Sequence, residues 1–248
     1  MMERWDLFFE VHNGETREGP GSLETTRKAF SYIKGISSDS VILDIGCGPG
    51  WQTLELARLC PARVTAIDLH QPFLDLLRRN IEVRSYADRF TIRNMSMGEM
   101  DFPAESFDLI WSEGAIYNIG FDRGVREFRR FLKPGGYLAV SEASWLKPGA
   151  PKEIRDFWNA EYPGIDTIGH CLEKLDAAGY GPVAHFALPD ADWFAYYDPM
   201  KGRIDDMLRR HHDDPDAREY YAMERHEYKL FEKYREWYGY VFYIAKKK

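Results

Sequence analysis

The sequence predicts an α/β fold in which a mainly parallel, doubly wound sheet carries helices on both faces. From about residue 40 onward, short apolar runs alternate with amphipathic stretches. Strands separated by helices pair in parallel through right-handed crossovers, which place helices on both sides of the sheet. A glycine-rich turn also follows the first apolar run. In such sheets, ligands bind beyond the carboxyl ends of the strands, so we expect the site residues there.

Each expected strand is a short run rich in β-branched and aromatic residues. These runs lie at residues 41–45, 63–68, 90–94, 107–111, 137–140, 183–186 and 239–245. Apolar residues recur at helical spacing in residues 51–60, 73–81, 125–132 and 165–178. The sequence KPGG at residues 133–136 predicts the end of the third of these helices.

Composition limits the classes of function. The 33 Lys and Arg residues and 40 Asp and Glu residues give a formal net charge of −7, which argues against a nucleic-acid partner. Cys47, Cys60 and Cys171 form no CxxC pair, so we expect no disulfide framework, no zinc site and a reducing, cytoplasmic location. No signal peptide and no run of 18 apolar residues is present, so we expect no membrane association. The sequence does not determine the oligomeric state, so a homodimer remains an open alternative.

A glycine loop joins the first strand to the first helix. Gly46, Gly48 and Gly50 form GxGxG, whereas a dinucleotide fingerprint would require glycine at the position of Trp51. No Walker loop is present. Asp68 ends the second strand, where a carboxylate can accept hydrogen bonds from ribose hydroxyls. Together, the loop and the acid predict a site for a ribose-bearing cofactor.

Four segments resemble the class I S-adenosylmethionine-dependent methyltransferases. They are VILDIGCGPG at residues 41–50, VTAIDLH at 64–70, MDFPAESFDLIWSEGA at 100–115 and FRRFLKPGGYLAVSE at 128–142. The likeness is closest to the small-molecule enzymes of menaquinone/ubiquinone biosynthesis and of the sterol type. SEGAIYNIGF at residues 112–121 resembles a narrower group of bacterial and archaeal methyltransferases.

The resemblance implies a Rossmann-like, seven-stranded sheet whose last strand is antiparallel. It implies one methyltransferase domain over residues 1–248, with an N-terminal lid or helices at 1–39. A cofactor-binding half would follow at 40–146. A substrate-side half would occupy 147–248, with a helical insertion at 190–238.

The resemblance also implies S-adenosyl-L-methionine as methyl donor, S-adenosyl-L-homocysteine as product and no metal. Asp44 and the glycine loop would hold the methionyl end and ribose, Asp68 the ribose hydroxyls, and Glu113 the methyl side. Leu69, Ser96 and Met97 would border adenine, although many relatives carry Asp where Ser96 stands. The implied cofactor residues are Asp44, Gly46, Cys47, Gly48, Gly50, Asp68, Leu69, Ser96, Met97 and Glu113.

Charge supports this interpretation, because the methyl donor is net positive and carboxylates complement it, whereas they would repel a pyrophosphate. Methyl transfer by in-line displacement mainly requires alignment and exclusion of water. A general base is needed only for a protonated nucleophile, so no catalytic residue is assigned. Two alternatives remain: a protein that binds the nucleoside cofactor without catalysis, and a nicotinamide-dependent oxidoreductase, which Trp51 disfavours.

Residues near the later strands are candidates for binding a small-molecule acceptor. They are Gly21, Ser22, Tyr117, Asn118, Trp145 and Trp193. Each has a structural alternative: Gly21 and Ser22 belong either to a hinged lid arm or to a helix cap. Asn118 could belong to a local turn, and Trp145 could pack on the following helix.

The remaining histidines and aromatic residues give weaker signals. His170 and His185 are isolated, and residues 211–214 (HHDD) read as a solvated helix end, because adjacent helical residues point apart. An aromatic stripe at residues 220–238, interrupted by Glu227, lies near one helix face. It either packs on the sheet or covers the acceptor pocket and sets its specificity.

Overall fold

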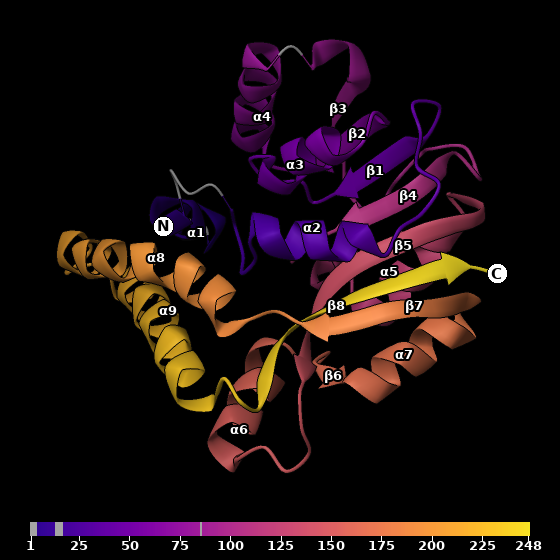
Figure 1. The fold of residues 1–248 in the computed structure, drawn as a ribbon. Helices are drawn as coiled ribbons and strands as arrows, with labels where there is room; N and C mark the ends of the chain where they lie inside the picture. Colours follow the sequence, from indigo (N-terminus) through magenta and orange to yellow (C-terminus); the bar gives the residue numbers. More distant parts are fainter. Residues whose placement is uncertain (1–3, 13–16, 85) are drawn as a thin grey trace.

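A computed structural model describes residues 4–12, 17–84 and 86–248 of the chain (Figure 1). Its sheet follows the order β3-β2-β1-β4-β5-β8-β7, and a short strand, β6, pairs with the end of β5. The strands are β1 (Val41–Ile45), β2 (Arg63–Asp68), β3 (Phe90–Asn94), β4 (Phe107–Ser112), β5 (Leu132–Trp145), β6 (Asp166–Thr167), β7 (Tyr180–Ala187) and β8 (Tyr238–Lys247). Because β8 runs antiparallel to both β5 and β7 while β1 to β5 pair in parallel, the expected mixed sheet is confirmed.

Helices cover both faces of this sheet, as the alternating pattern predicts (Figure 1). The helices are α1 (Arg4–His12), α2 (Leu23–Ser31), α3 (Trp51–Leu59), α4 (Gln71–Val83), α5 (Phe121–Arg129), α6 (Lys152–Glu161), α7 (Ile168–Ala177), α8 (Asp190–Arg210) and α9 (Pro215–Tyr234), with the 3-10 turns η1 (Ala87–Arg89) and η2 (Ile116–Asn118). Successive strand residues point to opposite faces. Leu43 therefore packs in the core with α5 and α7, whereas its neighbour Ile42 packs with α2 and α3.

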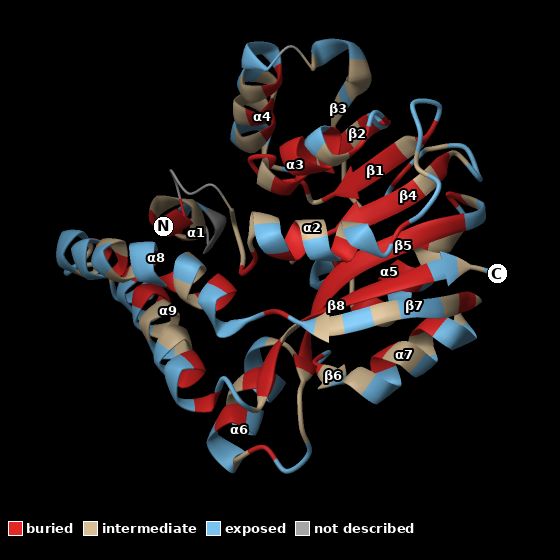
Figure 2. Cartoon of the chain, viewed as in Figure 1, coloured by how far each residue is buried: buried red, intermediate tan, exposed pale blue. Residues whose placement is uncertain are grey.

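The central strands are the most deeply buried part of the molecule (Figure 2). In β1 the side chains from Ile42 to Ile45 are all buried, as expected for a strand covered on both sides. By contrast, β7 at the sheet edge alternates between partly buried and exposed residues. The carboxyl ends of β1, β2 and β4 are thus held by a rigid core, which fixes the residues that follow them.

Helices α8 and α9 form a hairpin that packs against α1 away from the sheet (Figure 1). Apolar residues of all three helices share one cluster, which includes Val11, Ile204 and Tyr221. Pro199 lies inside α8. Residues 1–3 and 13–16 of the expected N-terminal lid lie outside the described residues. In the described part of the chain, no helix combines the length and the apolar character needed to cross a bilayer.

Candidate functional site

A cavity of about 540 Å³ lies at the carboxyl ends of the central strands and is also lined by residues of α1 and by residues 17–20. Its volume is typical of small-molecule sites. Eight of the ten expected cofactor residues line it, namely Gly46, Cys47, Gly48, Asp68, Leu69, Ser96, Met97 and Glu113. The structure therefore brings together residues that the sequence places at four separate strand ends.

The glycine loop needs glycine for two separate reasons. Gly46 has a φ of +69°, and a Cβ built on it would lie 2.4 Å from the Cβ of Ala115. Gly50 has a φ of +90°, and its Cβ would lie 2.2 Å from Cδ1 of Leu77. Both backbones are left-handed, and both are pressed against a neighbouring element. Gly50 does not line the cavity; it allows α4 to pack against the start of α3.

Asp68 is tied to the loop that it faces. Its carboxylate accepts hydrogen bonds from the N–H of Gly48 at 2.9 Å and from the N–H of His70 at 2.9 Å. The carboxylate therefore fixes the spacing between the β1 and β2 ends. Because a carboxylate can accept about four hydrogen bonds, it keeps the capacity to accept from ribose hydroxyls.

Asp44 lies behind the cavity and does not line it. Its fully buried carboxylate accepts hydrogen bonds from the hydroxyl of Thr53 at 2.6 Å and from Nε2 of Gln52 at 3.5 Å. Burial raises the pKa of Asp44 to about 7, against the opposing effect of the Thr53 hydrogen bond. Oδ1 of Asp44 has no partner among the described residues. Gln52, which lines the cavity, connects Asp44 to the loop through the carbonyl of Cys47.

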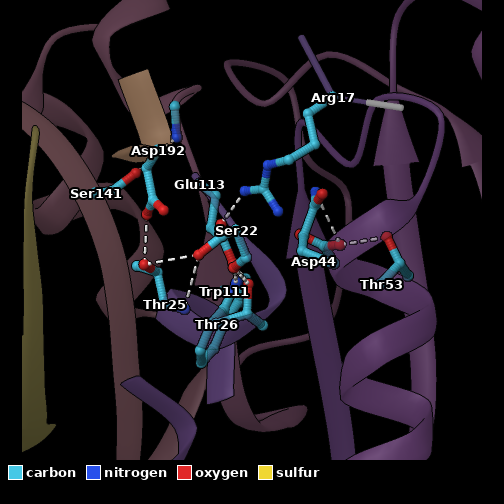
Figure 3. A network of polar contacts seen from close by, with 12 residues as sticks. Arg17, Ser22, Thr25, Thr26, Asp44, Thr53, Trp111, Glu113, Ser141 and Asp192 are labelled. Carbon is cyan, nitrogen blue, oxygen red and sulfur yellow. Dashed lines mark hydrogen bonds and ion pairs between the residues drawn. The ribbon is translucent and has the colours of Figure 1, made fainter. Parts of the chain in front are cut away.

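Glu113 is the centre of a polar network at the end of β4 (Figure 3). One carboxylate oxygen accepts from the hydroxyl of Thr26 at 2.8 Å and from the indole of Trp111 at 2.9 Å, and the other pairs with Arg17. The next backbone N–H, that of Gly114, donates to the hydroxyl of Ser141 at 2.8 Å. The network links the N-terminal segment to the ends of β4 and β5.

Sequence reasoning missed several residues of the cavity wall. Phe9 of α1 stacks on His70 with ring centroids 3.5 Å apart, and Phe73 packs edge-on against both rings. Burial lowers the pKa of His70. Arg17 is a cation of the same wall. His70 follows the end of β2, whereas Phe9, Phe73 and Arg17 come from α1, α4 and the residues before α2, whose positions no strand-end rule predicts.

The residues expected beside adenine lie together on one wall. Leu69 lines the cavity and is 66% exposed. The hydroxyl of Ser96 accepts from the N–H of Gly98 at 3.2 Å, so it stabilises a local turn. Asn94, at the end of β3, donates to the carbonyl of Leu69 at 2.9 Å.

A second cavity of about 410 Å³ adjoins the first, and the two share Gly114, Tyr117 and Asn118 among their lining residues. Trp193 lines only this second cavity. The amide of Asn118 also donates to the carbonyl of Ala115 at 2.9 Å, which is the local turn that the sequence offered as an alternative.

Three of the expected acceptor residues lie outside both cavities. Ser22 is the N-cap of α2, and its hydroxyl accepts from the N–H of Thr25 at 3.1 Å. Gly21 lies beside the guanidinium of Arg17. Trp145 packs against Tyr238 in the cluster formed with α6, α8 and α9. Trp145 is the last residue of β5, and its side chain packs in this cluster instead of lining a cavity.

The isolated histidines do not join either cavity. His170 is exposed and its Nδ1 lies 2.9 Å from Asp166, while His185 is exposed on β7. His211 differs from the expected solvated helix end: its Nε2 lies 2.8 Å from Glu10 of α1, so it helps to join α8 to α1. Over the described residues, no group of three or more His, Cys, Asp and Glu side chains is placed to hold a metal.

Residues 43–140 match the family model described as a methyltransferase domain. The chain is 31% identical over 157 residues to the ubiquinone/menaquinone biosynthesis C-methyltransferase UbiE of Geotalea daltonii, covering 62% of this chain and 66% of that protein. The chain belongs to the class I S-adenosylmethionine-dependent methyltransferase family. The chain is also 32% identical over 148 residues to the sterol 24-C-methyltransferase of Yarrowia lipolytica, covering 59% of this chain and 36% of that protein.

Solved structures show that the fold is that of the family over nearly the whole chain. YjhP from E. coli superposes with a TM-score of 0.84 at 22% identity, covering 98% of this chain and 99% of that chain. A methyltransferase from Geobacter sulfurreducens in complex with S-adenosyl-L-homocysteine superposes with a TM-score of 0.82 at 20% identity, covering 98% of each. The sequence matches are shorter, and the chain spans less than two thirds of the length of the curated relatives described above.

Proposed function

We propose that this chain transfers a methyl group from S-adenosylmethionine to a small-molecule acceptor by in-line displacement. The observation that carries the proposal is the pair of adjoining cavities, which share Gly114, Tyr117 and Asn118. A donor in the first cavity and an acceptor in the second would meet at this shared wall. Alignment of the two and exclusion of water are what such a displacement needs from a protein.

The first cavity has the chemistry to bind S-adenosylmethionine. Asp68 can accept from ribose hydroxyls, and Glu113 brings a second carboxylate toward a donor that carries net positive charge. The buried Oδ1 of Asp44, which has no partner in the part of the chain that the structure describes, lies behind the same loop. When bound, the donor supplies an electrophilic methyl group on a sulfonium. Arg17, the cation of this wall, is paired with Glu113 and would not offset the repulsion of a pyrophosphate.

The names of the relatives support the reaction class but not the acceptor. UbiE is named as a C-methyltransferase of ubiquinone/menaquinone biosynthesis, and the Yarrowia protein as a sterol C-methyltransferase. The family model ends at residue 140, before β8 and the α8–α9 hairpin that wall the second cavity. The acceptor therefore has to be inferred from this chain's own residues. We also infer a cytoplasmic location, in keeping with three free, buried cysteines.

Calorimetry with S-adenosylmethionine, S-adenosyl-L-homocysteine and NAD tests the cofactor. We expect the first two to bind and NAD to bind more weakly or not at all; tighter binding of NAD would overturn the proposal. Catalysis is tested by incubation with methyl-labelled S-adenosylmethionine and a metabolite extract, followed by identification of the labelled product. Tight cofactor binding with no label transferred to any metabolite would favour the non-catalytic alternative.

A further inference from the structure

The second cavity is walled by aromatic rings from several separate elements. The rings include those of Tyr117, Trp158, Trp193, Tyr196, Tyr220 and Tyr240. Trp193 and Tyr240 lie with their ring centroids 5.1 Å apart, which brings α8 against β8 at this wall. Aromatic faces carry negative electrostatic potential and attract cations, most strongly where water is excluded.

Carboxylates are interleaved with these rings. Glu224 and Glu227 lie three residues apart on α9 and so share a helix face, and Glu161 approaches from the end of α6. Glu18 adds a fourth carboxyl group at the border with the first cavity. Among the described residues that line this cavity, none is Lys or Arg. The carboxyl groups of this lining are therefore not balanced by a Lys or Arg side chain of the same lining.

The charge state of this wall is tuned by burial. Burial, with a smaller contribution from the neighbouring Glu224, raises the pKa of Glu227 to about 8, against a 2.7 Å hydrogen bond from the hydroxyl of Tyr197. His12, which is fully buried and also lines the cavity, has its pKa lowered by burial to about 3 and is therefore neutral near pH 7. A cation entering the cavity would remove much of the cost of ionising Glu227.

Several buried polar atoms of the wall have no hydrogen-bond partner among the described residues. The indole Nε1 of Trp158, a side chain only 8% exposed, and Nε2 of the fully buried His12 both lack a partner among the described residues. Buried polar groups are normally satisfied, so unmet ones in a cavity wall indicate a place for a polar ligand. This observation is independent of the carboxylates and indicates a ligand in the same cavity.

We propose that the methyl acceptor is a small amine that enters this aromatic, acidic cavity as an ammonium cation and is methylated on nitrogen. The inference rests on the methyl-transfer function proposed above. Acceptors that react as anions, such as carboxylates and phenolates, would be repelled by the glutamates. A nitrogen acceptor instead gains positive charge as it reacts, and a preformed negative environment stabilises that charge.

The step balances without another reactant. The ammonium first gives one proton to a carboxylate of the wall, and Glu227 suits this role because its pKa lies near the working pH. The nitrogen lone pair then forms the N–C bond, while the C–S bond breaks and its electron pair stays on sulfur. The products are S-adenosyl-L-homocysteine and a methylated ammonium.

Binding of choline and of its uncharged isostere 3,3-dimethylbutan-1-ol tests the proposal directly. Both are titrated calorimetrically into the intact protein, with and without S-adenosyl-L-homocysteine. We expect choline to bind about tenfold tighter or more, as a desolvated cation–π site predicts. Glu227→Gln should remove most of this preference. Glu219→Gln removes the same charge from an exposed position on the same helix and should retain it. Thermal melts verify that both variants fold.

The outcomes separate this proposal from the one on which it rests. Equal affinity for the two probes, no binding of choline, or an equal effect of Glu227→Gln and Glu219→Gln would each overturn the amine assignment. Binding of S-adenosyl-L-homocysteine in the same titrations would then leave methyl transfer standing. Conversely, preference for choline without any affinity for S-adenosyl-L-homocysteine would overturn methyl transfer. As a second readout, label from S-adenosylmethionine should pass to amines and not to matched alcohols or carboxylic acids.

Discussion

Arg17 and Glu113, which lie 96 positions apart in the chain, form an ion pair in the wall of the first cavity. Both side chains are largely withdrawn from water, with exposures of 12% and 4%. The pair joins the N-terminal segment to the end of β4, and Thr26 and Trp111 complete the bonding of the carboxylate. Removing one partner of such a pair leaves the other charge desolvated and uncompensated.

Glu113→Gln should therefore destabilise the free protein markedly. We expect the free energy of unfolding to fall by about 2–4 kcal/mol, because a part-buried guanidinium loses its counter-charge. Urea denaturation at pH 7 measures this. Glu236→Gln is the matched control, since Glu236 pairs with Lys147 at an exposed site and should change stability little. Similar losses of unfolding free energy in the two variants would show that the Arg17–Glu113 pair stabilises the fold no more than an exposed ion pair does.

Asp68→Ala should weaken binding of S-adenosylmethionine by about 1.5–3 kcal/mol, the usual size for lost hydrogen bonds to a charged group. The change also removes the acceptor of the Gly48 and His70 N–H groups, so the glycine loop should loosen. Calorimetry measures the affinity. Asp75→Ala, on the exposed side of α4, is the control and should bind the donor normally. Unchanged affinity of Asp68→Ala would place the ribose elsewhere.

The stability of the free protein should fall as the pH rises above about 5. Burial raises the pKa of Glu142 to about 8, from an ordinary value of 4.5. Between these values the folded state holds a proton that the unfolded chain has lost, so unfolding becomes easier with each unit of pH. Asp44, with its pKa raised to about 7, acts in the same direction. Glu142→Gln should flatten the profile, by on the order of 2 kcal/mol between pH 5.5 and 7.5. Parallel profiles for the two proteins, from urea denaturation, would contradict this.

Gly46→Ala should cost more stability than Gly35→Ala, although both glycines have positive φ angles, +69° and +81°. The left-handed backbone costs each variant about 1–2 kcal/mol. At Gly46 the new methyl group also meets Ala115, whereas nothing lies within 4 Å of a Cβ at Gly35. We expect a further loss of about 1–3 kcal/mol from this overlap, together with reduced cofactor affinity. Urea denaturation measures the loss of stability, and calorimetry measures the cofactor affinity. Equal losses of stability in the two variants would mean that the loop can shift away from Ala115.

The sheet and the glycine loop could be predicted from the sequence because both depend on local patterns. Each buried strand has its own apolar run, and Gly46, Asp68 and Glu113 follow strand ends that converge at one edge. The structure differs from the expected sheet in two details. β5 begins at Leu132, so it includes the glycines expected to end a helix, and β6 is too short to leave a pattern.

The rest of the site depends on long-range packing. Phe9, Arg17 and Trp158 line the cavities because their parts of the chain pack against elements that are distant in the sequence. No local sequence pattern predicts such contacts. Trp145 was a pocket candidate because it follows the expected fifth strand, with packing as the alternative, and its side chain packs in the cluster with Tyr238. Glu227 did leave a signal: it interrupts an aromatic stripe, as a charged residue does when it faces a cavity instead of the core.

The place of β8 has a consequence for how the chain is made. Strand β8 is the last element, yet it lies between β5 and β7 and supplies buried residues such as Phe242 and Tyr243 to both faces of the sheet. During synthesis, β7 leaves the ribosome before β8 and has no strand to pair with until residues 238–247 emerge. Until then its hydrogen-bonding edge and that of β5 stay open to other chains. The growing polypeptide therefore depends on the arrival of residues 238–247, or on a chaperone, to avoid aggregation.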